Sequence, residues 1–226
     1  MKIAILAAMD KELSLLKSLL ENPGSRRIDN IECITGHIGS HEVLLAKCGI
    51  GKVNAALNTL RNIRDFTPEL VINSGVAGGA GPLGIGALLV AGEVAYHDVW
   101  CGPGTLTGAA DGFSQVFLTD REVLDVALAA LGVTASYGLI ATGDRFISKA
   151  EEIERIHEIF PHAEAVDMES AAIAQVCASF GVPFFGMRVI SDSPWASHDN
   201  SRQYDDFWED APRHSFNLVK KLLTSL

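Results

Sequence analysis

The sequence predicts a single α/β domain, and three observations support this prediction. Short apolar runs typical of buried strands recur along the whole chain. They are interspersed with stretches in which apolar residues follow helical spacing. The chain has 226 residues, 48% hydrophobic and 20% charged, which is enough to bury a sizeable core. No internal repeat and no low-complexity tract divides it, so we expect one domain over residues 1–226.

Residue patterns in the first third of the chain predict several strands and one helix. The apolar run KIAILAAM at 2–9 predicts a buried strand. Leu13, Leu16 and Leu20 then follow at helical spacing, and Asn22-Pro23-Gly24 should end that helix. Three further strands are predicted by IECITGHI at 31–38, EVLLAKCGI at 42–50 and ELVINSG at 69–75.

The rest of the chain continues the mixture. Strands are predicted at 87–97, 137–144, 163–167 and 183–191, and helices at 121–132 and 168–181. The segment from Trp100 to Ser114 is rich in Gly, Thr and Ala, which predicts a long loop.

Composition excludes several classes of protein. A formal net charge of -10 and the lack of a basic stripe argue against binding to nucleic acid. The N-terminal apolar run, Ile3 to Met9, is short and lacks a cleavage region, and no segment reaches the ~18 apolar residues of a membrane span. The cysteines form no CxxC pair, which indicates reduced thiols in a cytoplasmic protein; they are Cys33, Cys48, Cys101 and Cys177.

Carboxylates follow three of the predicted strands. Glu12 follows the first, Asp167 and Glu169 follow AEAV, and Asp192 follows FFGMRVIS. Ligands of open α/β sheets bind beyond the carboxyl ends of the strands, so these acids could converge on one crevice. Paired carboxylates suit glycosidic cleavage, where one acid protonates the leaving group and another activates water. The alternative is helix capping by Asp10, Asp167 or Asp192.

Other catalytic motifs are absent or out of context. GAGPLG at 79–84 matches GxGxxG, but Pro82 and the strand that follows remove the helix that a dinucleotide fingerprint needs. The glycines of 74–79 would instead let backbone amides approach a flat ligand. The sequence has no GxSxG, no P-loop and no HExxH or Cys/His cluster, so we expect no catalytic metal and no cofactor.

Seven segments, in order, resemble the nucleoside phosphorylase and nucleosidase superfamily, and within it the 5'-methylthioadenosine/S-adenosylhomocysteine nucleosidases. They are MKIAILAAMDKEL, CGIGKVNAA, NSGVAGG, YHD, ATGDRFI, AVDMESAAIAQVC and VPFFGMRVISD, and they run nearly end to end. The resemblance implies a three-layer α/β/α sandwich with a central mixed sheet. It also implies hydrolysis of the bond between adenine and a 5'-thio-substituted ribose, with 5'-deoxyadenosine as a further expected substrate.

The resemblance assigns roles to the acids. Asp192 matches the general acid toward N7 of adenine, Glu12 the residue that activates water, and Glu169 the residue that grips the ribose hydroxyls. Arg188 and Ser191 match residues that support the water and the acid. The remaining substrate contacts implied are Ala8, Met9, Ile50, Val76, Ala77, Gly78, Phe146, Ile147, Val166, Asp167, Met168 and Tyr204, with Phe146 stacked on the purine.

The chain departs from the family pattern in its substrate contacts. Val76 stands where serine is frequent, Asp167 where glutamate is common, and Tyr204 where a phenylalanine commonly covers the 5' substituent. The segment 193–208 is slightly longer than usual. The family also forms homodimers, and Trp100–Ser114 is the candidate loop for closing the partner's 5' pocket.

Three other functions stay open. A phosphorylase of the same fold would need cations around phosphate, and the Gly-Asp-Pro-x-Arg style loop of such enzymes is missing from AAMDKE. Futalosine hydrolase, a relative that cleaves a similar bond, would differ only in the 5' pocket. A nucleoside-binding module without catalysis is the third, since fold alone does not establish chemistry.

Overall fold

The computed structural model describes residues 1–132, 135–195, 200–209 and 219–226. It has ten strands: β1 (Lys2–Ala7), β2 (Glu21–Ile28), β3 (Ile31–Ile38), β4 (His41–Lys47), β5 (Leu70–Gly79), β6 (Leu88–Tyr96), β7 (Val116–Leu118), β8 (Ala135–Thr142), β9 (Ala163–Asp167) and β10 (Phe184–Asp192). The helices are α1 (Asp10–Lys17), α2 (Lys52–Phe66), α3 (Arg121–Leu131), α4 (Ala150–Ile159), α5 (Ser170–Phe180) and α6 (Asn200–Glu209). The mixed α/β prediction is confirmed.

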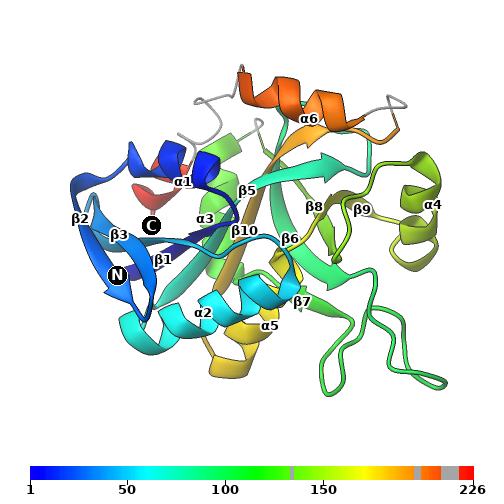
Figure 1. The fold of residues 1–226 in the computed structure, drawn as a ribbon, viewed down its shortest axis with the longest axis horizontal. Coiled ribbons are helices and arrows are strands. Elements are labelled where there is room, and N and C mark those ends of the chain that lie inside the picture. The colour runs from blue at the N-terminus through cyan, green and yellow to red at the C-terminus, as the bar shows by residue number, and fades with distance from the viewer. Residues whose placement is uncertain (133–134, 196–199, 210–218) are drawn as a thin grey trace.

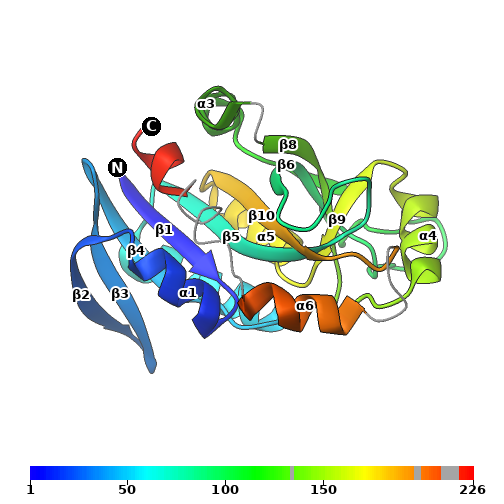
Figure 2. The same ribbon diagram turned by 90° about the horizontal axis from the view of Figure 1, so that it is seen from above.

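All ten strands belong to one mixed sheet, part of which closes on itself. The strand order is β10-β6-β8-β9-β5-β1-β4-β3-β2, with β7 paired to β6. Because β5 also pairs with β10, the strands β5, β10, β6, β8 and β9 form a ring. From β5 the strands β1, β4, β3 and β2 extend as an open wing, which lies at the opposite end of the molecule from α4 (Figure 2).

Helices cover both faces of the open wing. Ala4 and Leu6 of β1 belong to a core that also contains residues of α2 and α5. Ile3 and Ile5 face the other way and join a core with residues of α1 and α3. Figure 1 shows α2 and α5 along the lower side and α1 and α3 along the upper side. A strand covered on both faces has no solvent side, which explains why β1 is continuously apolar after Lys2.

The predicted end of the first helix is wrong. α1 ends at Lys17, and Asn22-Pro23-Gly24 lies within β2 rather than in a loop. β2 is the last strand of the open wing, and a proline is tolerated there because an edge strand does not need every ladder bond. The β2–β3 pairing is irregular between Glu21 and Gly24, which accommodates the break.

Three helices of the described residues were not predicted from the sequence, namely α2, α4 and α6. α2 buries a face that includes the polar Thr59 and Asn62, so its apolar periodicity is weak. α4 buries only Ile153 and Ile156. The long loop is confirmed, since Trp100 to Ser114 contains neither helix nor strand and projects at the lower right of Figure 1. Within the described ranges, no helix has the length and apolarity needed to cross a membrane.

Burial predicts a large difference between two leucines that both lie on strands. Leu44 of β4 is completely buried between the helical layers, whereas Leu118 of β7 is 68% exposed. We expect Leu44→Ala to lower the free energy of unfolding by about 2–5 kcal/mol, because it removes apolar burial and leaves a cavity. Leu118→Ala should change it by less than about 1 kcal/mol. Urea denaturation of both variants measures the difference, and equal effects would contradict the described core.

Candidate active site

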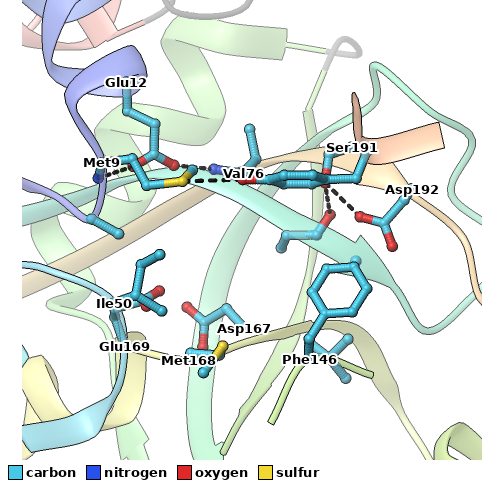
Figure 3. A pocket seen from close by; sticks show the side chains of 15 residues that line it. Met9, Glu12, Ile50, Val76, Phe146, Asp167, Met168, Glu169, Ser191 and Asp192 are labelled. Carbon is cyan, nitrogen blue, oxygen red and sulfur yellow. Dashed lines mark hydrogen bonds between the residues drawn. The ribbon is translucent and has the colours of Figure 1, made fainter. Parts of the chain in front are cut away.

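A cavity of about 350 Å³ opens at the carboxyl ends of six strands (Figure 3). Its lining comes from the segments that follow β1, β4, β8 and β9, from the ends of β5, β9 and β10, and from α6. The lining residues are Ala8, Met9, Glu12, Ile50, Val76, Ala77, Gly78, Phe146, Val166, Asp167, Met168, Glu169, Ser191, Asp192 and Tyr204. All of them are among the residues expected from the sequence. The other two expected residues, Arg188 and Ile147, lie outside this lining.

Glu12 lies in the first turn of α1 with its carboxylate turned into the cavity. It is 2% exposed, and its two oxygens accept the backbone amides of Met9 and Val76, each at 2.9 Å. Burial raises the pKa of Glu12, and the Val76 amide, Arg188 and the Met9 amide oppose this rise. The two amides favour an ionised carboxylate, which is the form that can accept a proton.

The Glu12 carboxylate approaches β5 closely at Gly75. A Cβ atom at Gly75 would overlap Oε1 of Glu12, so a larger residue would displace the carboxylate. Gly75, the first glycine of NSGVAGG, therefore leaves room for the Glu12 carboxylate rather than for a ligand.

Glu169 occupies the N-cap position of α5 without capping that helix. Its Oε1 instead accepts the amide of Gly51, the residue before α2, at 3.1 Å. The side chain is buried, and burial together with the neighbouring Asp167 raises the pKa of Glu169 to about 8, against the opposing effect of Arg188. An acid that bridges from β9 to the start of α2 and faces a cavity is suited to bind a ligand.

Asp167 has a different task from its neighbour. Its carboxylate accepts the Ser170 amide at 3.1 Å and the Thr142 hydroxyl at 2.6 Å, and it pairs with Arg188 at 2.7 Å. The predicted alternative of helix capping is therefore right for Asp167. Arg188, 2% exposed, also donates to the backbone oxygen of Asn73 at 3.1 Å and so ties β10 to β5 and β9 below the cavity.

Asp192 ends β10 and is held through both oxygens. Ser191 donates its hydroxyl to Oδ1 at 2.7 Å, and Asn200 donates its amide to Oδ2 at 2.6 Å. Asp192 is 2% exposed, and burial raises its pKa while the two donors oppose the rise. A buried carboxyl without a cation among its hydrogen-bond partners holds its proton more tightly than an exposed aspartic acid does.

Asn200 is the residue that the sequence analysis missed. It is completely buried at the start of α6 and also donates to the backbone oxygen of Ile147 at 3.0 Å. No sequence motif or regular spacing connects Asn200 to Asp192. Residues 196–199 of the longer 193–208 segment lie outside the described ranges.

Aromatic and apolar side chains form the rest of the wall. Phe146 is 46% exposed, which leaves its ring free to contact a ligand. Tyr204 of α6 lies across the cavity, with its ring 5.9 Å from that of Phe146 and its hydroxyl 3.0 Å from the Met9 sulfur. The site thus combines a flat apolar face with three separate acids, Glu12, Glu169 and Asp192.

Among the described residues, no three His, Cys, Asp or Glu side chains are grouped to hold a metal ion. GAGPLG lies where β5 ends and the chain returns toward β6 without a helix, so the dinucleotide fingerprint lacks its context.

Known proteins resemble the chain over its whole length. The family model of the phosphorylase superfamily matches residues 2–224. A 5'-methylthioadenosine/S-adenosylhomocysteine nucleosidase of Halalkalibacterium halodurans is 41% identical, covering 100% of this chain and 99% of its own.

Solved structures give the same result. The S. pneumoniae nucleosidase of that name, solved with a transition-state inhibitor, MT-ImmA, superposes with a TM-score of 0.94 at 33% identity and covers 100% of this chain and 99% of its own. A futalosine hydrolase mutant of Helicobacter pylori superposes with a TM-score of 0.92 at 29% identity, with coverage of 100% and 99%.

The raised pKa of Glu169 predicts how stability depends on pH. An unperturbed glutamate has a pKa of 4.5, and burial raises that of Glu169 to about 8. A raised folded-state pKa contributes stability that is complete below the unfolded-state pKa and is lost as pH rises through the folded-state value. Wild type should therefore lose stability relative to Glu169→Gln between pH 4.5 and about 8. Urea unfolding across that range measures it.

Glu154→Gln is the control, because Glu154 is exposed on α4. Its unfolding free energy should follow that of wild type at every pH. Parallel curves for wild type and Glu169→Gln would show that the Glu169 carboxyl titrates normally.

Proposed function

The chain belongs to the 5'-methylthioadenosine/S-adenosylhomocysteine nucleosidase family of the phosphorylase superfamily, and on that premise we propose how it cleaves an N-glycosidic bond. The substrates are 5'-methylthioadenosine and S-adenosylhomocysteine, with 5'-deoxyadenosine as a further one. The products are adenine and the 5-substituted ribose, and water is the nucleophile. The observation that carries the mechanism is the convergence of three buried acids on one cavity.

Asp192 is the general acid. Its proton passes to N7 of adenine while the bond from the sugar to N9 breaks, so the base leaves as a neutral molecule. Burial, which raises the pKa of Asp192, supports this role because only the protonated carboxyl can donate. Ser191, which donates to Oδ1, orients the acid.

Glu12 is the base that activates water. It lies on the opposite side of the cavity from Asp192 (Figure 3), as a displacement at the sugar carbon requires. The amides of Met9 and Val76 support an ionised carboxylate that can take a proton from the attacking water. Arg188 supports this site from beneath through its charge.

Glu169 binds the ribose 2' and 3' hydroxyls, since an ionised carboxylate accepts two hydrogen bonds. Its raised pKa implies that substrate binding draws the group toward its ionised form. Met168 packs on the sugar. Phe146 stacks on the purine, whose edge meets the Ile147 backbone, and the remaining lining residues, Ala8, Ile50, Ala77, Gly78 and Val166, close the walls.

The departures from the family pattern have limited consequences in this proposal. Val76 contributes its backbone amide to Glu12, which any residue could supply. Asp167 is occupied by Arg188 and Ser170 and supports the site from behind. Tyr204 covers the 5' side and adds a hydroxyl near Met9.

Hydrolysis fits the site better than phosphorolysis. Within the described residues, no lysine or arginine lines the cavity, and Arg188 beneath it is already paired with Asp167. Phosphate would meet three acids without a free cation. Futalosine remains the second candidate substrate because of the Helicobacter pylori relative, which has lower identity to this chain than the S. pneumoniae nucleosidase.

We also propose that residues 1–226 form one nucleosidase domain, a three-layer α/β/α sandwich, and that two copies form a two-fold homodimer. Exposed apolar side chains support the dimer, namely Ile50, Val53, Leu57, Trp100 and Leu106. The Trp100–Ser114 loop would then help to close the partner's pocket. The free state of all four cysteines supports a reducing, cytoplasmic location.

One incubation separates the candidate functions. Purified protein is incubated with 5'-methylthioadenosine in phosphate-free buffer and again with phosphate, and the products are separated by chromatography. We expect adenine and methylthioribose in both buffers. A sugar phosphate that forms only with phosphate would make the chain a phosphorylase, and cleavage of futalosine alone would make it a futalosine hydrolase.

Asp192→Asn should bind substrate and fail to cleave it. The amide keeps the shape of the side chain but cannot give the proton, so kcat should fall by about 10²–10⁴. Calorimetry measures binding and adenine release measures turnover. Asp206, exposed on helix α6, provides the control, and Asp206→Asn should keep wild-type kcat. Turnover within tenfold of wild type in Asp192→Asn would remove Asp192 from its role.

A further inference from the structure

A single amide joins two groups at one end of the cavity. Asn200, fully buried, donates from Nδ2 to Oδ2 of Asp192 at 2.6 Å and to the backbone oxygen of Ile147 at 3.0 Å. An amide NH2 has two hydrogens in one plane, so it can serve both acceptors at once. Asp192 ends β10, whereas Ile147 follows β8, and Asn200 of α6 ties these two parts of the wall together.

The two groups that Asn200 joins match one edge of adenine. That edge presents the N7 acceptor beside the N6 amino donor. A protonated Asp192 donates to N7, and the Ile147 carbonyl has a second lone pair that can accept from N6. Their separation therefore has to match the spacing of two neighbouring atoms on a rigid ring, and loose side chains or loops would not keep it.

We propose that Asn200 is a positioning residue of the reaction: it holds Asp192 and the Ile147 carbonyl at the spacing of the adenine edge and stabilises the Asp192 carboxylate once its proton has gone to the base. This inference rests on the proposed function, in which Asp192 protonates the leaving adenine.

Ser191 can form a hydrogen bond with both the protonated and the ionised carboxyl of Asp192, whereas Asn200 favours the ionised form. The Ser191 hydroxyl lies 2.7 Å from Oδ1 of Asp192 and 3.2 Å from the Ala77 carbonyl. When Asp192 carries a proton, the Ser191 hydroxyl can donate to the Ala77 carbonyl instead, and its oxygen can accept a hydrogen bond from the protonated carboxyl. The Asn200 NH2 can only donate, so it always favours the ionised carboxylate. Both bonds oppose the effect of burial on the pKa of Asp192.

Other titratable groups face the same cavity. Glu12 comes from α1, Asp167 and Glu169 from the β9–α5 junction, and Tyr204 from α6, while the charge of Arg188 lies beneath. Burial raises the pKa of Glu169 to about 8, so one pH profile alone would not identify Asp192. Of these groups, within the described residues, Asp192 is the one that receives a hydrogen bond from Asn200.

The test compares Asn200→Ala with a variant that loosens α6 elsewhere. Phe207 is 8% exposed and packs the same helix into the core, so Phe207→Leu should lower Tm without touching Asp192. The kcat and KM for 5'-methylthioadenosine are measured across pH. Because Asp192 acts while protonated, kcat is lost as pH rises through its pKa. Removing a donor to the carboxylate should move this loss about one pH unit upward and lower kcat about tenfold.

Phe207→Leu should leave the position of the pH limb unchanged. Asn200→Ser, which keeps a shorter donor, covers the case in which the alanine variant does not fold, and it should shift the limb in the same direction. An alkaline limb at the wild-type position in both Asn200 variants would reduce Asn200 to a structural residue and overturn the proposal.

Adenine affinity against pH, measured by calorimetry, repeats the test without turnover. Asn200→Ala should weaken adenine binding and shift its pH dependence, and Phe207→Leu should not. If the wild-type chain binds adenine but cleaves no nucleoside, the proposed function is wrong. The comparison of adenine binding between the two variants would still show whether Asn200 positions Asp192 and the Ile147 carbonyl.

Discussion

The site depends on one buried ion pair, that of Arg188 and Asp167, whose side chains are 2% and 1% exposed. Arg188 comes from β10 and also binds Asn73 of β5 and the hydroxyl of Ser170 at the start of α5. The pair therefore fixes the strand ends and the helix start from which the cavity is built. Removing either partner would leave an unpaired charge in the interior, which costs several kcal/mol, about 3–5.

This pair also determines the charge balance of the cavity. Asp167 neutralises Arg188, so Glu12, Glu169 and Asp192 share no cation of their own among the described residues. Burial raises the pKa of each of the three. Their local partners then separate their roles. Two backbone amides favour the ionised form of Glu12, one amide binds Glu169, and side-chain donors hold Asp192, a division that suits one base, one ligand-binding group and one acid.

Much of this arrangement could be predicted from local sequence. Glu12, Glu169 and Asp192 each follow an apolar run, and the rule that ligands bind beyond strand carboxyl ends brings them together. The resemblance added the apolar wall. What local patterns could not predict is long-range: the β5–β10 pairing that closes the ring, and the bond from Asn200 to Asp192. The first helix was extended too far because Asn22-Pro23-Gly24 resembles a turn, although an edge strand can contain it.

The cavity should hold at least one protonated carboxyl near neutral pH, because burial raises the pKa of Glu169 to about 8. Infrared difference spectroscopy measures this directly, because a protonated carboxyl has a carbonyl band that a carboxylate lacks. We expect such a band in wild type at pH 7, weakened in Glu169→Gln and unchanged in the exposed Asp206→Asn. Spectra that show every cavity carboxyl ionised at that pH would contradict it.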